Sequence, residues 1–127
     1  MKNIRVLVNG AKGSMGQEVV KAVTAAADLE IVDQTDLGDD LIARIRGSQA
    51  QAVVDFTTAA VAFENTRKIL EAGVHPVVGT SGLLAEQVAE LQQLAKDKDI
   101  GGLIAPNFAI GAVLLMKYAQ DAAKYLP

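Results

Sequence analysis

The sequence predicts an α/β fold, a doubly wound parallel sheet with helices on both faces, in a single domain of residues 1–127. The first observation behind this prediction is that five short apolar runs alternate with stretches of helical periodicity, as in consecutive βαβ units. The second is the opening of the chain, where the apolar run 4–8 leads into Gly10, Gly13 and Gly16 and then into a helical apolar stripe. A strand, a glycine-rich turn and a helix in this order begin a dinucleotide-binding unit, so the expected fold is Rossmann-like.

The individual elements follow from local patterns in chain order. Ile4, Val6 and Val8 are typical of a buried strand, and the stretch after residue 84 places leucine and valine at three- and four-residue steps. Thr57 or Thr58 is expected to cap the helix that follows the third strand. The expected strands are 1–9, 29–34, 52–56, 75–78 and 103–104, and the expected helices end near residues 27, 47, 73, 99 and 125.

The glycine turn predicts a binding site for a pyrophosphate. A side chain on Gly10 or Gly13 would hold the pyrophosphate away from the backbone amides of the turn, and Gly16 allows the helix and the strand to pack closely. The helix N-terminus adds unpaired N–H groups and a partial positive charge. If the glycines are considered alone, the alternative interpretation is a tight strand–helix turn that binds no ligand. An acidic residue at the expected distance downstream favours the nucleotide.

That acidic residue is Asp36, twenty positions after Gly16, where a carboxylate accepts hydrogen bonds from the adenosine ribose. Asp33 is the alternative for this role. Leu37 cannot pair with a 2′-phosphate, whereas Lys12 lies inside the turn and is able to reach a phosphate. The pattern therefore favours NAD(H) and leaves NADP(H) open.

Composition excludes several classes of function. The net charge of −3 offers no basic surface for nucleic acid, and the absence of cysteine excludes disulfides and thiolate metal sites. No apolar run reaches the roughly 18–20 residues that cross a bilayer. Because the N-terminus enters a strand within a few residues, no signal peptide is expected. We expect a cytoplasmic location.

Four loops that follow strands contain unusual residues and are expected to gather at the carboxyl edge of the sheet, where ligands of such folds bind. Any one of them alone would pass for an ordinary turn. The loops are Gly10–Gly16, Asp55–Thr57, Gly79–Gly82 and Pro106–Gly111.

The sequence offers no complete set of catalytic residues and no metal site. His75, the single histidine, begins a strand and is expected at the opposite edge of the sheet in a structural role. Asp55 is the one candidate for a general acid near the predicted site, and we expect it to organise a turn rather than to transfer protons. The chain is therefore expected to bind a nucleotide without carrying all the chemistry.

The same loops, taken together, resemble those of the dihydrodipicolinate reductase family (4-hydroxy-tetrahydrodipicolinate reductase). The match extends over the whole chain and is most specific in its last motif. The residues that carry it are G-A-K-G-S-M-G at 10–16, V-V-D-F-T at 53–57, V-V-G-T-S-G at 77–82 and A-P-N-F-A-I-G at 105–111.

The resemblance implies which residues contact the cofactor. The pyrophosphate would lie on the glycine turn, the adenosine ribose on Asp36, and the nicotinamide end against the later loops, with Thr57 bordering the same cleft. Four positions depart from the common pattern: Ser14 and Leu37 replace frequent arginines, Ser81 replaces a threonine, and Ala109 replaces a serine. The implied cofactor residues are Gly10, Ala11, Lys12, Gly13, Ser14, Met15, Asp36, Phe56, Gly79, Thr80, Ser81, Pro106, Asn107, Phe108 and Ala109.

The resemblance also implies an activity and a missing part. Members transfer a hydride from a nicotinamide nucleotide to a cyclic, imine-type dicarboxylate in the diaminopimelate route to lysine. They continue into a second domain, through which the family forms a homotetramer. This domain contains an H-H-x-x-K-x-D-x-P-S-G-T segment, whose histidine and lysine take part in the reaction. This chain stops before that segment, so it is expected to be the nucleotide-binding domain, to bind the dicarboxylate only with the missing domain, and to be inactive alone. The alternative is a stand-alone NAD(P)-binding module without turnover.

Overall fold

In the computed structural model, which describes residues 2–105 and 107–126, five parallel strands form one sheet in the order β2-β1-β3-β4-β5. β2 lies on one side of β1, and β3, β4 and β5 follow on the other side. The topological switch point therefore lies between β1 and β3. This order confirms the predicted doubly wound fold. The strands are β1 Ile4–Asn9, β2 Leu29–Thr35, β3 Ala52–Asp55, β4 His75–Val78 and β5 Leu103–Ile104.

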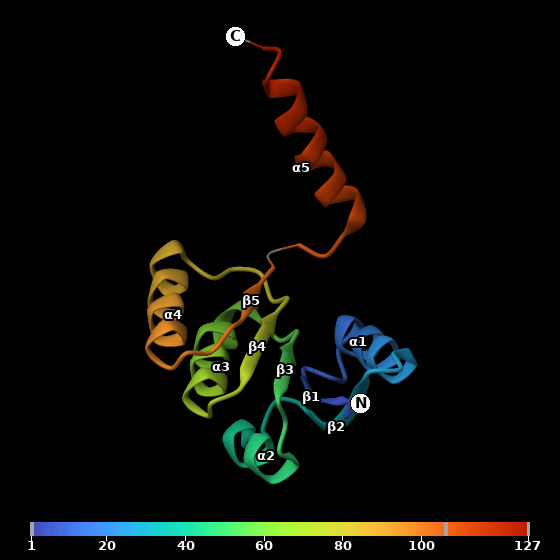
Figure 1. The fold of residues 1–127 in the computed structure, drawn as a ribbon, viewed down its shortest axis with the longest axis vertical. Coiled ribbons are helices and arrows are strands. Elements are labelled where there is room, and N and C mark those ends of the chain that lie inside the picture. The colour runs from blue at the N-terminus through green and yellow to red at the C-terminus, as the bar shows by residue number, and fades with distance from the viewer. Residues whose placement is uncertain (1, 106, 127) are drawn as a thin grey trace.

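The described residues form five helices, and four of them surround the sheet in Figure 1. The expected helices are all present, and the differences from the prediction are confined to their ends. The helices are α1 Ser14–Ala25, α2 Leu41–Ser48, α3 Ala59–Glu71, α4 Ala85–Asp97 and α5 Ile110–Ala123.

The core lies on both faces of the sheet because successive side chains of β1 point in opposite directions. Leu7 is fully buried on the face that α2 and α3 cover, whereas Val6 and Val8 are buried on the face that α1 covers. The first cluster contains Leu7, Leu41, Ile45, Ala50, Val53, Ile69 and Val74, and the second contains Val6, Val8, Ala11 and Val23.

Several boundaries differ from the prediction. The first strand begins at Ile4, not at residue 1, and the third ends at Asp55. α2 runs past Gly47 to Ser48 and is followed by its C-cap residue Gln49, which adopts the left-handed conformation with φ 54°. Thr58 is the N-cap residue of α3, as one of the two alternatives predicted. Its hydroxyl makes no capping hydrogen bond, so the predicted side-chain cap is absent.

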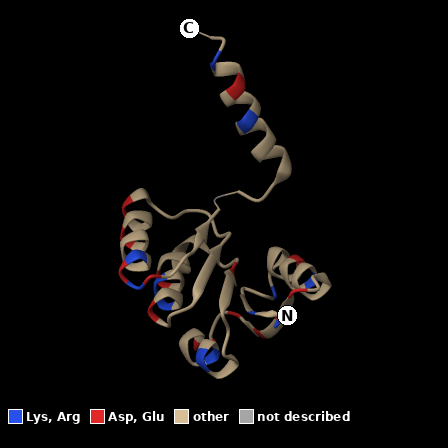
Figure 2. Ribbon diagram, in the orientation of Figure 1, with Lys and Arg blue, Asp and Glu red and all other residues tan. Residues whose placement is uncertain are grey.

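α5 differs from the other helices because it extends away from the sheet (Figure 1). All of its residues except Ala112 are exposed, and most of them are apolar. Figure 2 shows few charged residues on it. Its large exposed apolar side chains are Ile110, Val113, Leu114, Leu115, Met116 and Tyr118.

Across residues 2–105 and 107–126, no helix has both the length and the apolar character needed to cross a membrane.

Candidate nucleotide-binding site

The loops that follow β1, β3, β4 and β5 meet in a cavity of about 710 Å³ at the carboxyl edge of the sheet. The cavity brings together ten of the fifteen residues that the sequence assigned to a cofactor. Thr57 and Ala59 also line it. The ten are Gly13, Ser14, Met15, Phe56, Gly79, Thr80, Ser81, Asn107, Phe108 and Ala109.

The other five residues fall into two groups. Gly10, Ala11, Lys12 and Asp36 do not line the cavity, and they continue the glycine turn toward the end of β2. Pro106 lies outside the residues that the structure describes.

Two glycines of the turn are required by the fold itself. Gly10 has φ +83°, and a Cβ there would lie 2.2 Å from the carbonyl oxygen of Phe56. A Cβ on Gly16 would lie 1.9 Å from the carbonyl oxygen of Gly10, because helix α1 passes directly over the turn. Neither position accepts a side chain without movement of the backbone.

Gly13 is different from its two neighbours in the motif. Its φ of −67° and ψ of 162° are open to any residue, and a Cβ there would meet only the carbonyl oxygen of Gly10, at 3.3 Å. Since Gly13 lines the cavity, its missing side chain leaves the space in front of the helix N-terminus open.

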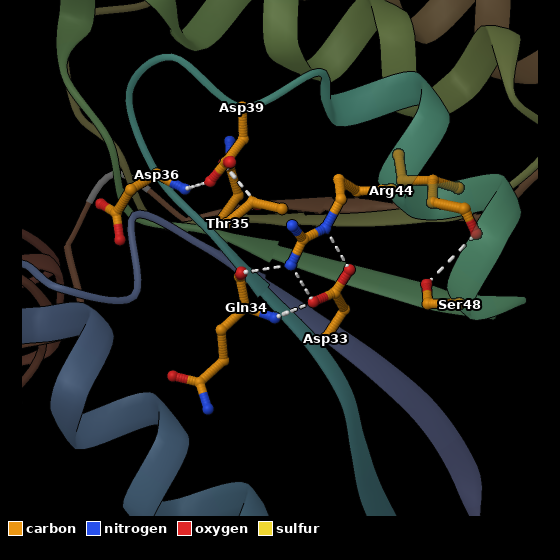
Figure 3. Close-up of polar contacts among 9 residues, drawn as sticks. Asp33, Gln34, Thr35, Asp36, Asp39, Arg44 and Ser48 are labelled. Atoms are coloured by element: carbon orange, nitrogen blue, oxygen red, sulfur yellow. Dashed lines mark hydrogen bonds and ion pairs between the residues drawn. The ribbon is translucent and has the colours of Figure 1, made fainter.

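Asp36 is joined to the glycine turn. The backbone N–H of Lys12 donates a hydrogen bond of 2.9 Å to Asp36 Oδ2, and the backbone N–H of Asp36 donates one of 2.8 Å to Asp39 Oδ2. Leu37 is almost fully exposed, at 98% of its accessible surface, and faces no partner in the core. Figure 3 shows the carboxylate of Asp36 pointing away from Arg44.

Asp33, the alternative ribose ligand, is held elsewhere. A bulge in β2 at Val32 brings Asp33 into register with Leu7, on the side of α2. There the Nε of Arg44 donates a hydrogen bond of 2.6 Å to Asp33 Oδ2, and Nη2 of the same guanidinium binds the other oxygen (Figure 3). The bidentate hydrogen bonds from Arg44 lower the pKa of Asp33 and raise the pKa of Arg44. Asp36 is therefore the better candidate for the ribose.

The carboxylate of Asp55 is fully buried beneath the cavity and organises the loops above it, as expected. Its Oδ2 accepts hydrogen bonds from Asn9 Nδ2 at 2.7 Å and from Asn65 Nδ2 at 3.1 Å. Its Oδ1 accepts hydrogen bonds from the hydroxyls of Thr57 at 2.8 Å and Thr80 at 2.9 Å. The sequence pattern did not single out Asn9 or Asn65, because a lone asparagine at the end of a strand or inside a helix carries no recognisable spacing.

Aromatic rings form one wall of the cavity. The ring centroids of Phe56 and Phe108 are 5.3 Å apart at an interplanar angle of 56°, and the absence of a side chain on Gly79 makes room for the ring of Phe56. Both rings line the cavity, so they present an apolar surface next to the hydroxyl of Ser81.

The opposite edge of the sheet is structural. His75 begins β4, and its Nδ1 forms a hydrogen bond of 2.8 Å with the carbonyl oxygen of Gly101. Within residues 2–105 and 107–126, no three side chains of the metal-binding types cluster.

Comparison with known sequences supplies the family. A sequence model described as "Dihydrodipicolinate reductase, N-terminus" matches residues 4–108. A 4-hydroxy-tetrahydrodipicolinate reductase of Coxiella burnetii is 46% identical over 124 residues, covering 98% of this chain and 52% of the relative. One of Streptococcus pneumoniae is 47% identical over 136 residues, covering 98% of this chain and 53% of the relative. The chain thus spans about half the length of the curated relatives it matches.

Comparison with solved structures agrees. The dipicolinate-bound dihydrodipicolinate reductase of Paenisporosarcina sp. TG-14 superimposes with a TM-score of 0.85 at 34% identity, over 97% of this chain and 54% of that one. A dehydrogenase of Clostridium difficile superimposes with a TM-score of 0.71 at 18% identity, over 82% of this chain and 39% of that one, which shows the fold alone.

Proposed function

Because the chain belongs to the dihydrodipicolinate reductase family, in its N-terminal region, we propose that it is the nicotinamide-nucleotide-binding domain of a 4-hydroxy-tetrahydrodipicolinate reductase. In this proposal the complete enzyme is a cytoplasmic homotetramer in the diaminopimelate route to lysine. A bound nicotinamide nucleotide would supply the hydride. This chain's residues would bind the nucleotide and orient it.

The observation that carries the proposal is Gly13. The fold requires Gly10 and Gly16, whereas at Gly13 the backbone conformation suits any residue and a Cβ would meet a single atom, at 3.3 Å, so the fold alone gives a much weaker reason for a glycine there. A ligand that approaches the N-terminus of α1 closely does explain it, since a pyrophosphate needs to reach the N–H groups there.

The remaining loops fit the two ends of the same nucleotide. Asp36 would accept hydrogen bonds from the adenosine ribose, and the cavity wall of Phe56, Gly79, Thr80 and Ser81 would hold the nicotinamide end. The loop of Pro106, Asn107, Phe108 and Ala109 would close that end.

We propose NAD(H) as the preferred cofactor, with NADP(H) as the weaker alternative. A 2′-phosphate next to Asp36 and Asp39 would meet two carboxylates, and the exposed Leu37 offers it no charge. Repulsion in this half-exposed location would disfavour NADP(H) by about 1 kcal/mol. Lys12 limits the difference because its ammonium group belongs to the same turn.

Hydride transfer to an imine carbon also needs a proton donor for the nitrogen and fixed partners for two carboxylates. Among the described residues that line the cavity, Ser81 provides a hydroxyl and none has a titratable side chain, and the carboxylate of Asp55 is buried beneath them. We therefore propose that a second domain, in the half of the relatives that this chain does not match, supplies the proton donor and binds the dicarboxylate.

The test is a titration with NADH, followed by its fluorescence. Gly13→Val should abolish binding while the circular dichroism spectrum stays native. Gly47→Val is the matched control, because Gly47 lies on the exposed surface of α2 with nothing within 4 Å of a Cβ. Full binding by Gly13→Val would place the pyrophosphate elsewhere, and absence of binding by the unaltered chain would overturn the proposal.

A coupled assay with freshly generated substrate tests whether this chain binds the nucleotide while a second domain supplies the proton donor. The chain alone should show no reductase activity, and adding the second half of a relative in cis should produce it. Turnover by the chain alone would place the proton donor within these residues. NADH binding without turnover in any longer form would instead favour a stand-alone binding module.

A further inference from the structure

Asp55 is a buried charged group for which the proposed hydride transfer has no chemical use. Its side chain is fully buried, and no lysine, arginine or histidine among the described residues lies within ion-pair distance of it. Five hydrogen bonds surround it instead, and no buried polar side-chain atom in the described residues lacks a partner.

Such a group is a poor choice for stability alone. Removing a carboxylate from water is costly, and an apolar side chain of similar size stabilises a core equally well or better. A role for the carboxylate therefore follows better from the groups that donate hydrogen bonds to it.

Those groups come from both walls of the cavity. Thr57 lies in the loop after β3 and Thr80 in the loop after β4, and both line the cavity. The hydroxyl of Thr80 accepts a hydrogen bond of 2.8 Å from the backbone N–H of Thr57 and donates one of 2.9 Å to Asp55 Oδ1. One hydroxyl therefore joins the two loops to each other and to the buried carboxylate.

The same carboxylate is also tied to the adenosine side of the sheet. Asn9 donates to Asp55 through Nδ2 and accepts a hydrogen bond of 2.8 Å from the hydroxyl of Thr35 through Oδ1. The carbonyl oxygen of Thr35 in turn accepts the backbone N–H groups of Gly10 and Ala11, at 2.8 and 3.2 Å. The buried polar chain thus runs beneath the whole site, but only its Asp55 end reaches side chains that line the cavity.

We propose that Asp55 is a positioning residue, which sets the nicotinamide end of the site through the Thr80 hydroxyl and the Thr57 backbone amide. This inference rests on the proposed function, since it assigns the nicotinamide to that end. The consequence is a split between the two ends of the site. Loss of the Thr80 hydroxyl should weaken binding of the nicotinamide and leave binding of the adenosine and pyrophosphate unchanged.

The experiment compares Thr80→Val with Thr66→Val in the full chain. Both side chains are buried, but the Thr66 hydroxyl donates only to the carbonyl oxygen of Ala62 within α3 and does not line the site. Each variant is titrated with NADH and with ADP-ribose, which lacks the nicotinamide. Thr80→Val should raise the Kd for NADH about tenfold and the Kd for ADP-ribose less than about twofold, as expected for one lost hydrogen bond at one end.

Two further variants keep the test decisive. Thr80→Ser retains the hydroxyl and should restore NADH binding. Asp55→Leu has a similar volume but offers no acceptor to the Thr80 hydroxyl, and it should reproduce the split even if Thr80→Val does not fold. Thr66→Val should bind both ligands as the unaltered chain does.

The outcomes separate the two proposals. If the unaltered chain binds both ligands and the two Kd values rise in parallel in Thr80→Val and Asp55→Leu, or neither rises, the positioning role is overturned and the proposed function stands. If the unaltered chain binds neither ligand, the proposed function is overturned and the positioning role with it.

Discussion

The two ends of the cleft hold their ligand-facing groups by different means. At the glycine turn, backbone conformation and the half-exposed carboxylate of Asp36 shape the surface, and little side-chain packing is involved. At the other end, the loops of Thr57 and Thr80 rest on the buried carboxylate of Asp55. The first end is therefore open to change in specificity at small cost, whereas a change at the second end also affects the stability of the domain.

The largest effect should follow from removing the buried carboxylate. Asp55→Ala leaves the buried amide of Asn9 without its acceptor and removes the shorter hydrogen bonds of Asn65 and Thr80, which should lower the free energy of unfolding by about 3 kcal/mol or more. Asp55→Asn should cost clearly less, because the Asn9 amide is able to turn and present its oxygen. Urea denaturation measures both, and equal costs would show that an amide of the same shape cannot replace the carboxylate in these hydrogen bonds.

A smaller effect should separate the glycines of the other end. Gly16→Ala should lower the free energy of unfolding by about 2 kcal/mol, because its Cβ would lie 1.9 Å from a backbone oxygen. Gly13→Ala should change it by less than about 0.5 kcal/mol. The same denaturation experiment decides. A large loss in Gly13→Ala would mean that the fold, not the ligand, requires this glycine.

A change of cofactor preference should be possible at the glycine end with only a small loss of stability, namely the exposed hydrogen bond from the Lys12 N–H to Asp36. Asp36→Ala should weaken NADH binding about fivefold and leave NADPH binding unchanged or improved, because the ribose loses an acceptor and the 2′-phosphate loses a repulsive charge. Isothermal titration with both cofactors measures the ratio. Parallel weakening of both would contradict a role for Asp36 at the 2′ position.

The smallest effect concerns Asp33, which lies near Asp36 but outside the cleft. Because Arg44 lowers the pKa of Asp33 in the folded chain, this pair stabilises the fold above the unfolded-state pKa of about 3.9, and the contribution disappears as the pH falls through the folded pKa. Asp33→Asn should therefore lower the urea midpoint slightly at pH 7 and not at all in strong acid. NADH binding at pH 7 should be unchanged, and a loss would make Asp33 the ribose ligand after all.

The arrangement of strands and helices was predictable from the sequence, because apolar periodicity and glycine positions are local signals. β4 and β5 have the predicted bounds, and the four loops gather at one edge as the topology requires. The polar network beneath the cleft was only partly predictable. Asp55 stood out at the end of a strand, whereas Asn9 and Asn65 are 46 and 10 residues away from it and meet it only through the tertiary fold.

Two further features depended on interactions that local patterns do not record. The choice between Asp33 and Asp36 rests on a one-residue bulge that turns Asp33 toward Arg44. Thr57 is one of the two threonines expected to cap α3, but its hydroxyl instead donates to the carboxylate of Asp55. In the first case the partner comes from another element, and in the second a carboxylate two residues earlier competes successfully with the helix N-terminus.

The contact between His75 and the carbonyl oxygen of Gly101 has a practical consequence for spectroscopy. The chain has one histidine, so its imidazole ring gives a single set of proton resonances that is identified without isotope labelling. The ring touches the loop before β5 and lies at the edge of the sheet away from the cleft. Its resonances therefore serve as an internal reference, because they report whether the edge of β4 is intact and stay in place while those of Phe56 and Phe108 shift on addition of nucleotide.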